Sequence, residues 1–147
     1  MSINDENFRI FAYWSSILVL KVLGMVVVIG RWRWGKRIFI SPEDTIFLKG
    51  SKIGENDPDV ERARRAHLND LENIFPWAVS TALWLTTSPS TWLAALLIKT
   101  FAISRIVHSI VYAVIVIPQP ARFLAFGLGF GITVYQSVDT FLYYYYT

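Results

Sequence analysis

Cysteine is absent from this 147-residue sequence, and histidine occurs only twice. The lack of cysteine excludes disulfide bonds, a cysteine nucleophile and a thiolate metal site. The two histidines, His67 and His108, lie in different predicted helices, so the sequence predicts no metal centre. Any thiol chemistry of this protein must therefore use a thiol that another molecule supplies.

Charged residues are also scarce, at 17% of the chain, whereas 54% of the residues are hydrophobic and 16% are aromatic. The mean hydropathy of +0.41 is too high for an ordinary soluble domain. The net charge of +3 does not indicate nucleic-acid binding, because the basic residues flank hydrophobic stretches. The composition therefore predicts an integral membrane protein that contacts lipid and binds no nucleic acid.

The hydrophobic stretches predict an all-α fold, a bundle of four transmembrane helices in a single domain that covers residues 1–147. A spanning helix needs roughly 20 apolar residues, which leaves little room for a second domain. The expected elements are helices at about 8–35, 59–87, 90–117 and 120–146, with a loop at about 36–58. Because this loop and its flanks are rich in lysine and arginine, we expect it to face the cytosol.

Polar residues gather at the opening of the second predicted helix. Arg65, Asn69 and Glu72 are spaced i, i+4 and i+7, so they share one helical face. Such groups inside a membrane helix either serve a ligand or tie helices together in a structural polar network, and the spacing alone leaves both open.

A second polar face is predicted on the third helix, where Arg105, His108 and Tyr112 are spaced i, i+3 and i+7. A charge within a span usually has a partner, and Asp70 on the second helix is the natural one for Arg105. Arg122 lies at the start of the fourth helix, where a cation gains nothing from the helix dipole. It either binds an anion or anchors the turn at the cytosolic surface.

Taken together, these side chains suit an anionic, peptide-like ligand at the cytosolic edge of the bundle. Arginines bind carboxylates, Asn69 can bind an amide, and Glu72 can bind an ammonium group. Glutathione carries all of these groups. Two lysines stay outside this set: we expect Lys21 to pack within the bundle or to snorkel, and nothing places Lys99 beside the ligand cluster.

Three segments, residues 38–44, 60–74 and 118–122, resemble the membrane-associated proteins in eicosanoid and glutathione metabolism, the MAPEG family. The resemblance implies a homotrimer that holds glutathione, as co-substrate, between neighbouring subunits near the cytosolic face. It also implies the endoplasmic reticulum membrane, with the mitochondrial outer membrane as a second location. The family's glutathione-binding residues match Arg33, Arg65, Asn69, Glu72, His108, Tyr112 and Arg122.

By this resemblance, Arg122 is the expected catalytic residue of a glutathione transferase. A cation near the sulfur favours the thiolate, which could attack lipophilic electrophiles or reduce lipid hydroperoxides. An isomerase like prostaglandin E synthase and a non-catalytic lipid-binding adaptor are the alternatives. Phe123 and Leu68 disfavour the isomerase, whose pattern has serine and arginine there. The segment from Tyr112 to Arg122 is also about a residue longer than in relatives, so the resemblance does not fix the exact placement of Arg122.

Overall fold

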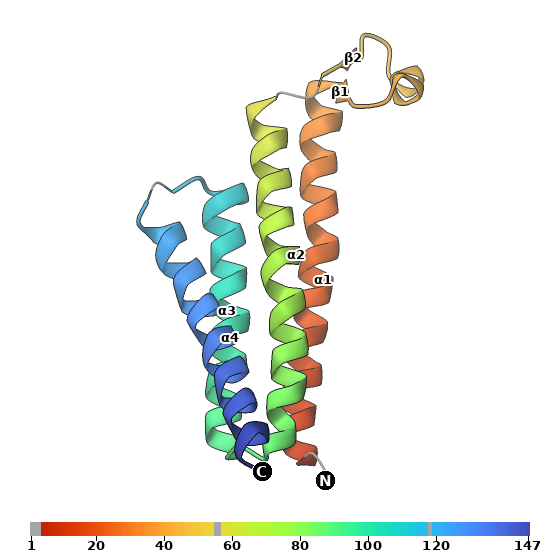
Figure 1. Cartoon of the computed structure of the whole chain (residues 1–147). Helices are drawn as coiled ribbons and strands as arrows, with labels where there is room; N and C mark the ends of the chain where they lie inside the picture. Colours follow the sequence, from red (N-terminus) through yellow and green to blue (C-terminus); the bar gives the residue numbers. More distant parts are fainter. Residues whose placement is uncertain (1–3, 55–56, 118) are drawn as a thin grey trace.

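Four long helices make up most of the computed structural model, which describes residues 4–54, 57–117 and 119–147. The helices are α1 (Asp5–Lys36), α2 (Pro58–Trp84), α3 (Thr91–Ser109) and α4 (Ala121–Tyr146). They run alternately up and down, so both termini lie at one end of the bundle (Figure 1). The α1–α2 connection and the α3–α4 turn lie towards the other end, which we call the loop end.

Side-chain caps explain where three of these helices begin. Asn4, Asp57 and Ser90 precede α1, α2 and α3, and each side chain accepts a hydrogen bond from a backbone N–H of the first turn. The first helix ends at Arg37, whose backbone adopts the left-handed conformation that commonly terminates helices.

The α1–α2 connection contains more regular structure than the sequence predicts. Strands β1 (Ile38–Phe39) and β2 (Lys52–Ile53) pair in parallel, and the 3₁₀ helix η1 (Pro42–Phe47) lies between them. Ser41 precedes η1, but its side chain makes no capping hydrogen bond. These elements are too short to leave a periodic hydrophobic pattern, which is why the sequence reads as a loop.

Two further elements change the ends of predicted helices. A short 3₁₀ helix, η2 (Leu85–Thr87), follows α2, and a π-helical segment, η3 (Ile110–Val114), follows α3. The third helix was expected to reach residue 117, but Ile115 is already extended. A π turn has wider winding than an α-helix and is rarely sustained, so the chain leaves the helix here.

The helices pack so that α1 and α4 each contact both α2 and α3. The main hydrophobic core lies towards the end that holds the termini and is dominated by aromatic rings. Trp77 of α2 is fully buried and stacks on Phe101 of α3, with ring centroids 4.3 Å apart and planes within 3°. Trp84 is also fully buried, and its indole N–H donates to Asp139 of α4 at 2.8 Å.

Two of the described helical stretches, Asp5–Lys36 and Thr91–Val114, are long and apolar enough to cross a membrane by length and composition. The other two helices are long, but charged residues crowd the first half of α2, and α4 ends in consecutive tyrosines. Many large hydrophobic side chains on the outside of the bundle remain exposed, as expected where lipid rather than water is the surrounding medium.

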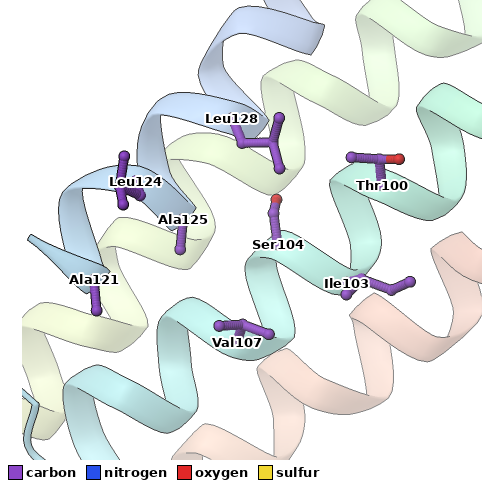
Figure 2. Close-up of a pocket in the computed structure, with 8 residues that line it drawn as sticks. All are labelled: Thr100, Ile103, Ser104, Val107, Ala121, Leu124, Ala125 and Leu128. Atoms are coloured by element: carbon purple, nitrogen blue, oxygen red, sulfur yellow. The ribbon is translucent and has the colours of Figure 1, made fainter.

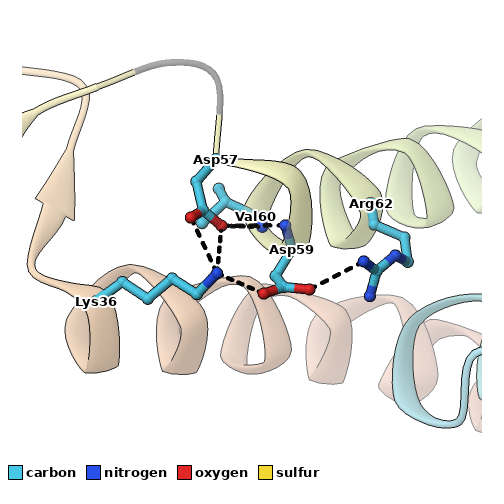
Figure 3. Close-up of polar contacts among 5 residues, drawn as sticks. All are labelled: Lys36, Asp57, Asp59, Val60 and Arg62. Carbon is cyan, nitrogen blue, oxygen red and sulfur yellow. Dashed lines mark hydrogen bonds and ion pairs between the residues drawn. The ribbon is translucent and has the colours of Figure 1, made fainter.

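An ionic cluster joins the end of α1 to the start of α2 (Figure 3). Lys36 Nζ lies 2.9 Å from both carboxylate oxygens of Asp57 and also pairs with Asp59, which in turn contacts Arg62 at 2.9 Å. The hydrogen bond from Lys36 holds the pKa of the Asp57 carboxyl below its ordinary value of 3.8. The cluster fixes the last turn of α1, which carries Arg33, against α2.

Candidate functional site

Ion pairing separates the charged residues of α2 into two kinds. Those of the first turns are paired, as between Arg64 and Glu61, whose side chains are 2.8 Å apart. By contrast, Arg65 and Glu72 are exposed, and the described part of the chain offers neither of them an ion-pair partner. These two are members of the predicted site.

A buried polar network occupies the middle of the bundle around Asp70. Arg105 Nη2 lies 2.8 Å from Asp70 Oδ1, and both side chains are fully buried, which confirms the pairing that the sequence predicts. Ser109 donates a hydrogen bond to the second carboxylate oxygen at 2.9 Å. Lys21 of α1 also forms an ion pair with this carboxylate, so one anion binds two cations and links three helices.

The same guanidinium reaches two residues of the predicted site. Arg105 Nη2 donates to Asn69 Oδ1 at 2.7 Å and lies 3.4 Å from Nδ1 of the buried His108 ring. The network that links α2 to α3 therefore also orients Asn69 and His108. A structural role of the network and a ligand-binding role of these two residues are thus compatible. Spacing alone does not reveal this link, since it depends on how the two helices face each other.

Aromatic contacts connect α3, η3 and α4 at the loop end. The His108 and Tyr112 rings lie 5.5 Å apart, and the guanidinium carbon of Arg122 lies 4.8 Å from the centre of the Tyr112 ring. This distance is typical of a cation–π interaction. The Nε of Arg122 is buried and has no hydrogen-bond partner within the described ranges. Arg122 therefore keeps unused capacity to bind an anion.

Two cavities flank the exposed face of α2 and divide the remaining site residues. A cavity of about 330 Å³ between α1 and α2 is lined by Arg33 and Arg65. A second one, of about 390 Å³ between α2 and α4, is lined by Asn69 and Glu72. Within one chain, the predicted set thus forms three groups rather than one cavity.

A third cavity, of about 400 Å³, lies between α3 and α4 and is almost entirely apolar (Figure 2). Its lining residues are Thr100, Ile103, Ser104, Val107, Ala121, Leu124, Ala125 and Leu128. The cavity begins beside the first turn of α4, next in sequence to Arg122. None of the residues that line this cavity carries a charge, so no polar pattern in the sequence marks it.

Acidic and histidine side chains do not gather into a candidate metal site within the ranges that the structure describes. The charged groups that do gather are mainly arginines, and these suit an anionic ligand rather than a cation.

Four packed helices with apolar outer surfaces and a polar cluster among them define a helical membrane protein. Residues 11–142 match the MAPEG family, and the chain belongs to it. It is 38% identical to human microsomal glutathione S-transferase 1 over 135 residues. This alignment covers 89% of this chain and 86% of the human protein. The pig protein of the same name is 40% identical over 134 residues, covering 88% of this chain and 86% of the relative. Bovine prostaglandin E synthase is 33% identical over 126 residues, an alignment that covers 86% of this chain and 82% of the bovine protein.

Proposed function

We propose that this protein is a membrane-bound glutathione transferase that stabilises the glutathione thiolate and conjugates it to lipophilic electrophiles. Reduction of lipid hydroperoxides by the same thiolate is a companion activity. The proposal draws on family membership and on relatives that are named glutathione S-transferases. It also draws on the charges of the candidate site.

The observation that carries the proposal is the pattern of unpaired charge. Arg33, Arg65, Glu72 and Arg122 have no ion-pair partner among the described residues, whereas Asp70 is paired with two cations. Charges without such a partner that line a cavity, as Arg33, Arg65 and Glu72 do, are available to bind a ligand. Glutathione offers two carboxylates and an ammonium group, which complement three arginines and a glutamate.

Arg122 has the catalytic role in this proposal. Its guanidinium is held against the Tyr112 ring, and its buried Nε is free to donate. A fixed cation beside the sulfur lowers the pKa of the bound thiol and so raises the fraction of thiolate, the nucleophilic form. His108 and Tyr112 would complete the pocket around the peptide.

The division of the site into three groups supports a homotrimer with glutathione between subunits. Arg33 and Arg65 line a cavity between α1 and α2, whereas Arg122 of α4 lies on the Tyr112 ring and does not line that cavity. Both groups belong to helix ends at the loop end (Figure 1), which the excess of basic residues assigns to the cytosol. We assign the protein to the endoplasmic reticulum membrane on its family alone.

The apolar cavity between α3 and α4 suits the second substrate. Its lining includes Ala121, next to Arg122 in the chain, and several exposed hydrophobic side chains such as Leu124 and Leu128 (Figure 2). A lipophilic electrophile could thus arrive from the bilayer without crossing water.

The test uses the detergent-purified protein and ultraviolet absorbance, which reports the glutathione thiolate directly. Adding glutathione is expected to raise thiolate absorbance, and a later addition of an activated aryl chloride is expected to consume it as conjugate forms. S-methylglutathione is the matched control, because it keeps the peptide groups but has no thiol to ionise. Glutathione binding without conjugation would overturn the transferase proposal in favour of an isomerase, to be tested with prostaglandin H2. No binding at all would favour the lipid-binding adaptor.

A further inference from the structure

A cavity of about 750 Å³ lies between α1 and α3, towards the end of the bundle that holds the termini. Arg9 on α1 and Lys99 on α3 both line it, together with Glu6, Tyr13 and Trp14. The proposed glutathione site uses none of these residues and lies towards the opposite end. Two cations from different helices therefore meet at a cavity that has no assigned role.

Pairing among the described residues explains neither cation. Arg9 and Lys99 are both exposed, and no ion pair to either occurs among the residues that the structure describes. Both cations are therefore available to bind an external anion.

The direction of these side chains brings them to one membrane surface. Side chains on a helix tilt towards its N-terminus, and α1 and α3 both begin at the end that holds the termini (Figure 1). Long basic side chains in this position snorkel to the interface and keep their charge at the level of the headgroups. Tyr13 and Trp14 in the same cavity are typical of that interface.

We propose that this cavity binds a phospholipid, with its phosphodiester between Arg9 and Lys99. The acyl chains extend along the apolar outer surfaces of α1 and α3. The carboxylate of Glu6, which lacks an ion-pair partner in the described residues, faces the amino group of an ethanolamine headgroup. Two cations and one carboxylate complement the phosphate and ammonium of that lipid. This site is independent of the proposed function.

Native mass spectrometry of the delipidated, detergent-purified protein tests the proposal. The probes are phosphatidylethanolamine, a diacylglycerol with the same acyl chains, and inorganic phosphate. We expect phosphatidylethanolamine to be retained about tenfold better than diacylglycerol, because the latter lacks the phosphate. We expect the Arg9→Gln/Lys99→Gln double variant to lose this preference, and Glu6→Gln to weaken the preference for phosphatidylethanolamine over phosphatidylglycerol.

The control is the Lys49→Gln/Lys52→Gln double variant, which removes the same charge from the α1–α2 connection and is expected to retain the lipid. Circular dichroism of each variant verifies that the helices are intact. Equal retention of phospholipid and diacylglycerol, or an unchanged preference in the Arg9/Lys99 variant, would overturn the proposal. So would equal binding of inorganic phosphate, which would make this a phosphate site, or a change in oligomer mass, which would make it a contact between chains.

Discussion

The two ends of the bundle are stabilised by different means. Towards the termini, large aromatic residues fill the core, and polar side chains of α2 find partners on α4, as between Thr81 and Gln136 at 2.9 Å. At the loop end, the corresponding hydrophobic cluster is small and centres on Met25, Ala66 and Ala113. Arg33 and Arg65, which have no ion-pair partner in the described part of the chain, line a cavity there.

We expect this contrast to separate stability from the proposed function along the length of the same helices. α2 contributes Trp77 and Trp84 to the packed end, whereas Arg65 lies nearer the loop end and Glu72 near the middle of the helix. Natural proteins commonly leave local rules unsatisfied at functional sites and compensate elsewhere. The packed end can hold the four helices together while the loop end keeps charged groups available.

The largest expected effect comes from removing the central ring of the packed end. Trp77→Ala deletes a fully buried indole that stacks on Phe101, so we expect a loss of about 3–5 kcal/mol in the free energy of unfolding. Denaturation of the detergent-solubilised protein, followed by circular dichroism, measures it. Trp92→Ala is the control, because that ring is 72% exposed and its loss is expected to change stability little. Equal effects of the two substitutions would contradict the contrast between the ends.

At the loop end, we expect substitutions to affect activity without affecting stability. Arg122→Ala is expected to lower turnover about 100-fold, because it removes the cation that stabilises the thiolate, and to change glutathione affinity much less. Glu72→Ala is expected to do the opposite and weaken glutathione binding about tenfold, since it removes only a partner of the ammonium group. Steady-state kinetics and a binding titration separate the two. Equal losses of turnover and affinity in both variants would undo this division of roles.

The smallest expected effect concerns the ionic cluster in Figure 3. Because the pKa of Asp57 is lowered in the folded state, its ion pair stabilises the protein above the ordinary pKa of 3.8, and this contribution is lost as the pH falls through the folded value. Asp57→Asn keeps a capping side chain but removes the charge, so its deficit in stability is expected at neutral pH and to vanish in acid. Thermal unfolding at several pH values measures the deficit. A deficit that does not change with pH would contradict the role of the charge.

The pattern of hydrophobic and polar residues predicted the four long helices and the buried ion pair between Arg105 and Asp70. The Arg105–Asp70 pair follows from two simple facts, the face on which each residue lies and the need of a charge within a span for a partner. The second cation on Asp70 was harder to predict. Lys21 was expected to pack or to snorkel, because a lone lysine in an apolar helix does not indicate which neighbouring helix it contacts.

The division of the site into groups lay beyond what periodicity can give. Spacing places Arg65, Asn69 and Glu72 on one broad face of α2, but which cavity each lines depends on the helix beside it. Arg33 and Arg65 line one cavity, where the Lys36 cluster holds the end of α1 against α2. That cluster is formed by residues on either side of a long connection, so no local pattern predicts it.

The π turn at η3 has a consequence for how this chain tolerates changes in length. A turn with an i→i+5 hydrogen bond contains one residue more than an α-helical turn. The extra residue does not change the orientation of the helix that precedes it. Tyr112 lies within that turn, between His108 on the regular helix and Arg122 beyond the connection. The π turn can therefore accommodate one inserted residue in this segment without rotating α3. The same turn sets the direction of the Tyr112 ring and so its contact with Arg122.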